Sequence, residues 1–208
     1  MQKKGFTLIE LLIVLALIAI LATILIVIIK PAQIFLRARD TQRSGDLRNL
    51  SQAADAYLAE LAQNSSLAWP ARGACQGSSS PYQIFFSATS TGVALTGWPN
   101  IPPNSGTGTV SQAIDGTGWV PLNFSQVSVL NLPQLPLDPR NGQTGTVNGS
   151  STMFAYSFAC DQTNYNYEFA AKLEGSTSTM ANDGGNENCT TTGPNCLYEV
   201  GPGKTSLY

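Results

Sequence analysis

The chain has 208 residues, of which 12% are charged, and it contains no histidine. Without histidine it cannot form a Ser/His/Asp or Cys/His nucleophile arrangement, and it lacks the commonest metal ligand and general base. Residues 30–48 carry five basic and two acidic side chains, whereas the chain from residue 49 onward carries four basic and ten acidic ones. We therefore expect a basic segment followed by an acidic body. Neither an enzyme nor a nucleic-acid-binding protein is expected.

The first element is an apolar run from Leu8 to Ile29 in which the only charged residue is Glu10. Its last 19 residues, 11–29, carry no charge, and at about 1.5 Å per residue they suffice to cross the hydrocarbon core of a bilayer. A cleaved secretory signal is disfavoured, because its apolar core usually has about 7–15 residues and ends at small residues. An ionised carboxylate at this depth costs about 2.5–3.5 kcal/mol on insertion scales. Glu10 therefore needs a partner.

A second helical pattern follows. Pro31 removes one backbone hydrogen bond and is expected to kink the helix. Beyond it, apolar residues recur at three- and four-residue steps, as in an amphipathic helix: Leu47, Leu50, Ala54, Leu58 and Leu61. The intervening residues 37–48 are polar on all sides, with Gly45 as a weak point. We expect one long helix over residues 6–63, interrupted at Pro31.

From residue 64 onward the composition changes to glycine, serine, threonine, asparagine and proline. Short apolar runs predict strands at 83–88, 154–159, 165–173 and 197–200. Residues 160–164 then form the loop of a hairpin, and residues 89–118 and 175–194 are expected to be long loops. Residues 138–142 are expected to form a turn without chemistry. The predicted fold class is α+β, with a long N-terminal helix packed on a small antiparallel sheet.

The four cysteines are Cys75, Cys160, Cys189 and Cys196, and none of them forms a CxxC pair. Zinc binding and thioredoxin-type chemistry therefore have little support. We expect two disulfides formed in an oxidising compartment, each stabilising the protein by about 2–4 kcal/mol. Three connectivities are possible, of which Cys75–Cys160 with Cys189–Cys196 is favoured. The loops of the head are then pinned by disulfides.

The segment KKGFTLIELLIVLALIAILA at residues 3–22 resembles the N-terminus of type IV prepilins and type II secretion pseudopilins. Proteins of that superfamily carry a short basic leader ending in glycine, followed by Phe, a Thr/Ser-Leu pair, Glu and an unbroken apolar helix. The resemblance implies that a prepilin peptidase cleaves after Gly5 and methylates the new amine of Phe6. It also implies that subunits polymerise through this helix, with Glu10 paired to the Phe6 amine of a neighbouring copy. The alternative for Glu10 is a carboxyl near the membrane surface that interacts with the helix dipole.

A weaker similarity to the same proteins covers residues 37–61, 135–142 and 165–174. Residues 89–135 match nothing that can be assigned. The proline also departs from the pattern, since in the family it usually lies about one turn earlier, within the apolar run. The site of any helix melting on assembly therefore stays open.

Residues 182–187 concentrate oxygen ligands in a glycine-rich loop, and calcium takes such ligands. The resembling pseudopilins carry a calcium site in their C-terminal loop. The spacing is not that of an EF-hand, so a solvated loop is the alternative, and no metal or other cofactor is expected. Trp69, Trp98 and Trp119 are expected to pack in the protein and not to stack on bases.

The predicted organisation is a leader at 1–5, a transmembrane and filament-core helix at 6–29, an amphipathic stem at 30–63 and a globular head at 64–208. The predicted function is a structural subunit of a type IV pilus-like filament, first in the inner membrane and then extracellular or periplasmic. Its expected partners are further copies of itself, the prepilin peptidase, an assembly ATPase and membrane platform proteins. Two alternatives stay open: a secretion pseudopilin, and an envelope-anchored binding protein that does not polymerise.

The charges near the apolar run conflict with this topology. Lys3 and Lys4 precede the run, and four basic residues follow it: Lys30, Arg37, Arg39 and Arg43. The positive-inside rule alone places the head in the cytoplasm, whereas the leader motif and the cysteines place it outside. The basic stem either meets acidic heads of neighbouring copies or is a solvated helix face.

Overall fold

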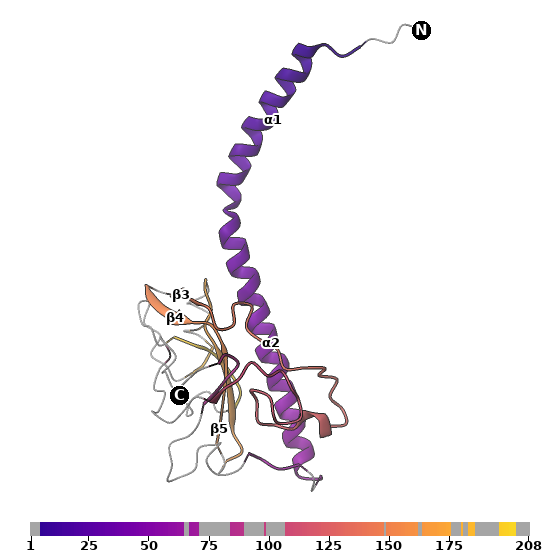
Figure 1. Ribbon diagram of the computed structural model, residues 1–208, viewed down its shortest axis with the longest axis vertical. Coiled ribbons are helices and arrows are strands. Elements are labelled where there is room, and N and C mark those ends of the chain that lie inside the picture. Colours follow the sequence, from indigo (N-terminus) through magenta and orange to yellow (C-terminus); the bar gives the residue numbers. More distant parts are fainter. Residues whose placement is uncertain are drawn as a thin grey trace. The chain divides into compact units, whose positions relative to one another are not determined.

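The computed structural model describes residues 5–64, 67–70, 84–89, 98, 107–147, 149–161, 164–175, 180, 183–185 and 196–202. The chain divides into two compact units, Met1–Leu36 and Arg37–Tyr208. The division falls inside the expected stem. Figure 1 labels the principal elements of both units.

The first unit contains helix α1 (Leu8–Ile29) and the beginning of helix α2 (Pro31–Leu61). The predicted interruption is present, and it lies at Lys30, which has the left-handed backbone angles φ 44° and ψ 68°. A residue before proline is disfavoured in the α conformation, whereas proline itself is well suited to the first position of a helix. Pro31 therefore starts a new helix. Helix α1 begins at Leu8 and not at the expected Phe6, because Thr7 caps it.

Helix α1 is apolar on every side. All of its side chains that the structure describes are exposed, and the one hydroxyl in its middle, of Thr23, donates to the carbonyl of Ala19 at 2.7 Å. By length and composition the segment Leu8–Ile26 could cross a membrane, a test that a signal sequence near an N-terminus also passes. A helix that is hydrophobic all round needs an apolar environment on all its faces. Within the described residues, nothing supplies that cover.

The second unit is built on a five-stranded sheet in the order β2-β1-β5-β6-β7. The strands are β1 (Phe85–Phe86), β2 (Thr107–Gly108), β5 (Tyr156–Cys160), β6 (Tyr167–Ala171) and β7 (Tyr198–Val200). All neighbouring strands are antiparallel except β1 and β2, which are parallel. A separate hairpin joins β3 (Thr144–Val147) to β4 (Ser150–Met153), and a short 3-10 helix, η1, covers Phe124–Gln126. The expected α+β class fits this arrangement.

Helix α2 lies along one face of the sheet that contains β5 (Figure 1). Its buried apolar face is the predicted stripe: Leu47, Leu50, Ala53, Ala54 and Tyr57. The sheet supplies alternate side chains to this core, among them Tyr167, Phe169 and Ala171 of β6. The intervening Ala170 packs in a second cluster with Trp98. Strands β5 and β6 are therefore buried throughout, because the sheet is covered on both faces.

Four predicted strands are confirmed with shorter bounds, as β1, β5, β6 and β7. Two features were not predicted. Strand β2 lies within residues 89–118, which were expected to be a loop, and its sequence Thr-Gly gives no apolar pattern. The hairpin of β3 and β4 is also polar, yet residues 148–149 between them read Asn-Gly, which is the strongest short hairpin signal.

A buried ionic cluster fixes α2 to the rest of the second unit. The guanidinium of Arg43 is 0% exposed. It donates to both carboxylate oxygens of Asp138 at 2.7 and 3.0 Å and to Asp40 at 2.9 Å, and it lies 2.8 Å from Glu174. Asp40 in turn accepts from the backbone of Glu174 and Gly175, at 2.8 Å each. The turn that contains Asp138 therefore holds the helix.

Glu174 is the shared acceptor of three arginines. Arg39 donates to it through two bonds of 2.7 and 2.8 Å, and Arg140 through one of 3.0 Å. The guanidinium groups of Arg43 and Arg140 also lie 4.8 and 4.5 Å from the ring centre of Phe154. At residues 40 and 43 both alternatives for the stem, acidic heads of neighbouring copies and a solvated helix face, are therefore wrong. These residues are buried against charges of their own head.

This cluster predicts an acid-sensitive fold. Burial alone would raise the pKa of Glu174, but hydrogen bonds from the three arginines outweigh it and lower the pKa from 4.5 to about 2. The ionised form therefore stabilises the folded state fully above about pH 4.5, and this stabilisation is lost as the pH falls toward 2. We expect the thermal unfolding midpoint to fall over that range, and to fall less in Glu174→Gln.

The matched control is Glu60→Gln, whose carboxyl accepts hydrogen bonds from Ser128. It should keep the wild-type dependence on pH. Circular dichroism of the full chain in detergent at several pH values measures both. If the thermal unfolding midpoint falls equally steeply with pH in the wild type and in Glu174→Gln, the acid sensitivity is not due to Glu174.

Candidate assembly site

Gly5 and Phe6 lie immediately before α1 in an open environment. A Cβ atom built on Gly5 meets no atom within 4 Å, and Phe6 is 85% exposed. The described part of the fold therefore requires neither a glycine nor an aromatic residue here. A requirement for these residues must come from something that acts on the chain from outside, as a processing enzyme does.

Thr7 and Glu10 form a reciprocal cap at the start of α1. Thr7 has extended backbone angles, and its hydroxyl accepts from the amide of Glu10 at 3.4 Å. The Oε2 atom of Glu10 accepts from the amide of Thr7 at 2.9 Å and from its hydroxyl at 2.8 Å. This is a capping box, which satisfies helix amides that otherwise have no partner. In the single chain, the partner of Glu10 is thus Thr7.

This contact was not predicted, although its signal is readable in the sequence. A Thr followed three residues later by Glu, directly before an apolar run, is the signature of a capping box. The expected partner of Glu10, the Phe6 amine of another copy, lies outside a single chain and stays a prediction. The cap does not exclude it, because an ionised carboxylate has about four acceptor positions. Glu10 can accept from a cation while it still caps its own helix.

The expected disulfides are placed only in part. Cys75 and Cys189 lie outside the described residues. Cys160, at the end of β5, and Cys196, before β7, are both buried, and neither is a free thiol. Their connectivity stays a prediction.

The proposed calcium loop is also described in part, since residues 182, 186 and 187 lie outside the described residues. Asp183 accepts from the amide of Gly185 at 2.9 Å and from the amide of Glu199, in β7, at 2.7 Å. The carboxylate therefore ties the loop to the sheet. Among the described residues no group of three His, Cys, Asp or Glu side chains is placed to hold a metal.

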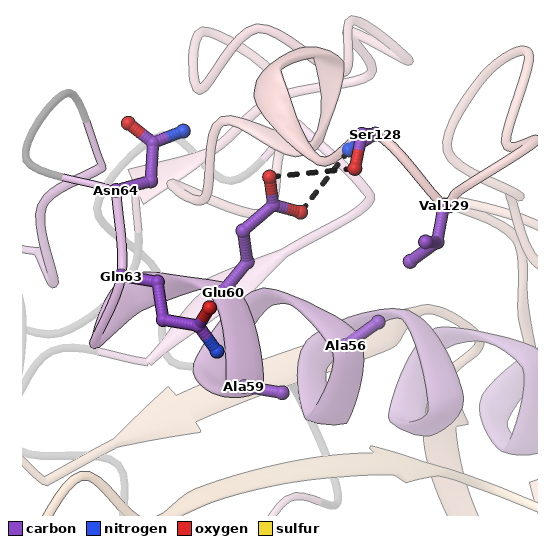
Figure 2. A pocket seen from close by; sticks show the side chains of 7 residues that line it. All are labelled: Ala56, Ala59, Glu60, Gln63, Asn64, Ser128 and Val129. Carbon is purple, nitrogen blue, oxygen red and sulfur yellow. Dashed lines mark hydrogen bonds between the residues drawn. The ribbon is translucent and has the colours of Figure 1, made fainter.

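Two grooves flank the C-terminal part of α2. The first has a volume of about 610 Å³ and is lined by Ala56, Ala59, Glu60, Gln63, Asn64, Ser128 and Val129. Figure 2 shows the side chain of Glu60 directed at Ser128, with Val129 beyond it. Glu60 accepts from the amide and the hydroxyl of Ser128 at 3.1 and 3.5 Å. The second groove has a volume of about 550 Å³ and is lined by Leu58, Leu61, Ala62, Asn164, Tyr165, Asn166 and Pro202.

Each groove contains one titratable side chain. In the first it is Glu60, which accepts from Ser128, and in the second it is Tyr165. General acid–base catalysis needs a titratable group within reach of the substrate.

Residues 1–26 match the family model described as the prokaryotic N-terminal methylation motif. This motif is the signature of type IV pilins and pseudopilins, so the resemblance noted at residues 3–22 is confirmed. No curated protein and no solved structure matches the chain. The motif spans Gly5, Phe6, Thr7 and Glu10, and it supports a type IV pilin- or pseudopilin-like precursor.

The capping box generates a prediction that does not depend on assembly. In Thr7→Val the first turn of α1 loses its side-chain acceptor, and a cap of this kind is worth about 0.5–2 kcal/mol. Amide hydrogen exchange at Glu10 and Leu11 should become about 2- to 30-fold faster in detergent micelles, measured by NMR. Thr23→Val is the matched control, because its hydroxyl donates within the middle of the helix. Unchanged exchange in Thr7→Val would show that the cap does not form.

Proposed function

We propose that this chain is the precursor of a structural subunit of a type IV pilus-like filament. It is cleaved between Gly5 and Phe6, methylated on the new amine of Phe6, and polymerised through the helix of residues 6–29. The observation that carries the proposal is the methylation motif at residues 1–26, placed on a helix whose described side chains are all exposed and almost all apolar.

The apolar helix is suited to two successive environments, first a membrane and then a bundle of helices. Before assembly, α1 lies in the inner membrane, because lipid covers an apolar helix on every face. After assembly, the helices of other copies replace the lipid. A helix with one polar face could not make this exchange without exposing apolar surface or burying polar surface.

Glu10 sets the register between the helices of neighbouring copies. Cleavage creates an amine at Phe6, one residue before the cap, and this cation belongs to every processed copy. A carboxylate of one copy and an amine of the next form a desolvated pair, and removing one partner of such a pair costs about 3–5 kcal/mol. The intrachain cap holds the Glu10 side chain at the start of the helix until that amine arrives.

The second unit contains the head, residues 64–208, which the filament displays outside the cytoplasm. Its oxidised Cys160 and Cys196 support an oxidising compartment, and disulfides to Cys75 and Cys189 would pin its loops. The assembly ATPase, the platform proteins and the prepilin peptidase are the partners that this function requires. A secretion pseudopilin is the second candidate, because the same motif at residues 1–26 marks both classes.

Processing predicts a defined N-terminus. Intact-mass and peptide mass spectrometry of the native protein should find a chain that begins at Phe6 with one added methyl group on its amine. Gly5→Val should accumulate as the uncleaved precursor, because an extended, unhindered backbone is lost at the cleavage position. A native protein that still begins at Met1 would exclude the proposed function.

Two variants of Glu10 separate the effect of its helix cap on assembly from the effect of its charge. Glu10→Gln keeps the capping box, since glutamine also serves at this position, but it cannot pair with an amine as an anion. Glu10→Leu loses both. We expect both variants to insert and to be cleaved, and both to lose filaments in electron microscopy of sheared surface material.

Normal filaments from Glu10→Gln, with none from Glu10→Leu, would assign the residue to the cap alone. The length of wild-type filaments separates the two candidates, since a pilus extends beyond the cell and a pseudopilus stays short. A processed protein that forms neither is an envelope-anchored protein.

A further inference from the structure

The head presents one apolar side chain that its own fold leaves almost bare. Among the described residues of the second unit, three large apolar side chains are exposed: Val110, Val129 and Tyr165 at 54%, 78% and 51%. Val129 is the most exposed of them. It stands at the rim of the first groove, away from the side chain of Glu60 (Figure 2). This exposed valine, called the knob below, contributes nothing to the hydrophobic core of its own copy.

The second groove is apolar enough to accept the side chain of Val129. Leu58 and Leu61 of α2 line it together with Ala62, which directly follows the helix, and with Tyr165 and Pro202. Leu58 and Leu61 also pack against the core, so their side of the groove is firmly held. None of the lining residues carries a charge. The groove therefore accepts an uncharged, apolar group and offers a charged ligand no counter-ion.

Tyr165 is held in this groove at a conformational cost. Its φ of 56° is in the left-handed region, which a tyrosine rarely adopts. The ring packs edge-on against Trp69, with the ring centres 5.9 Å apart, and Trp69 donates to the carbonyl of Asp161 at 3.2 Å. Such strained residues persist where the surrounding structure fixes them, and they gather at binding sites.

The knob and the groove lie on opposite sides of α2. The first groove uses residues 56, 59, 60 and 63, and the second uses 58, 61 and 62, of which residues 62 and 63 directly follow the end of α2. With 3.6 residues per turn, each set forms one stripe, and the two stripes point in roughly opposite directions. Both stripes occupy the same two turns of the helix. When copies of this chain stand side by side and parallel, the knob of one faces the groove of the next.

We propose that Val129 of one copy inserts into the groove lined by Leu58, Leu61 and Tyr165 of the adjacent copy. This inference rests on the proposed function, because it needs parallel neighbouring copies. The contact is heterologous, because the knob and the groove are different surfaces. A chain of copies therefore keeps a free knob at one end and a free groove at the other, and it grows into a helical filament when the rotation between copies does not close a ring.

The test uses exposed positions on both surfaces. Val129→Asp puts a charge on the knob, and Ala62→Asp puts one in the groove, where residue 62 is exposed. Each variant should reduce filament yield at least about tenfold, as a charge buried in an apolar contact does. Combining Val129→Asp with Ala62→Lys should restore part of the yield, because the two charges then attract across the contact.

Val110→Asp is the matched control, since Val110 is an exposed valine of the same head and lines neither groove. It should assemble like the wild type. Mass spectrometry of the N-terminus and thermal unfolding should show that all variants are cleaved and folded. If Val129→Asp assembles normally while the wild type makes filaments, this inference fails and the proposed function stands. If the processed wild type makes no filaments, both fail.

Crosslinking gives a second, independent measurement. A photo-reactive amino acid at position 129, activated in cells, should yield a dimer of this chain linked to residues 58–62 or 164–166 of the other copy. The same group at position 110 should not give that product. An adduct between position 129 and a different protein, or with lipid alone, would overturn the proposal.

Discussion

The constraint on which the molecule depends is a helix that has no polar face. Almost every side chain of α1 is apolar, and all the described ones are exposed in the single chain, so α1 is stable only where something apolar surrounds it. A bilayer and a bundle of identical helices are two such environments, and the proposed function moves the helix from one to the other. The polar atoms at its start form hydrogen bonds within the same chain, through Thr7 and Glu10. The helix cap therefore stays intact when the helix moves from lipid into the bundle.

The second unit differs from α1, because it holds a charged helix segment against a small sheet. Arg43 and its carboxylate partners are buried, and truncating Arg43 would leave the carboxylate of Asp138 buried without a cation, at a cost of about 3–5 kcal/mol. The cluster joins α2 to Asp138, before β3, and to Glu174, after β6. The same helix carries the apolar core on its next turns. Ionic and apolar contacts therefore fix the helix at successive levels, and the grooves near residues 56–63 take their shape from this fixed position.

Much of the fold could be read from periodicity, and much of the candidate site from the motif. The stripe through Leu47, Leu50 and Ala54 predicted the buried face of α2, and four apolar runs predicted β1, β5, β6 and β7. The hairpin of β3 and β4 was missed because its residues are polar, so only the Asn-Gly turn signals it. The burial of Arg43 could not be predicted, since two of its three acidic partners, Asp138 and Glu174, lie 95 and 131 residues further along the chain, and local pattern carries no information on such pairs.

The sequence by itself determined the N-terminal part of this protein: the methylation motif, the capping residues and the membrane-length helix are all local, and each is encoded within the first 30 residues. Only the tertiary structure decided how the head is held and which surfaces it presents. Asp138, Glu174, Val129 and Tyr165 acquire their roles from segments that are brought beside α2 by folding. Their chemistry depends on burial and on neighbours distant in the chain, and these are properties of the packed molecule.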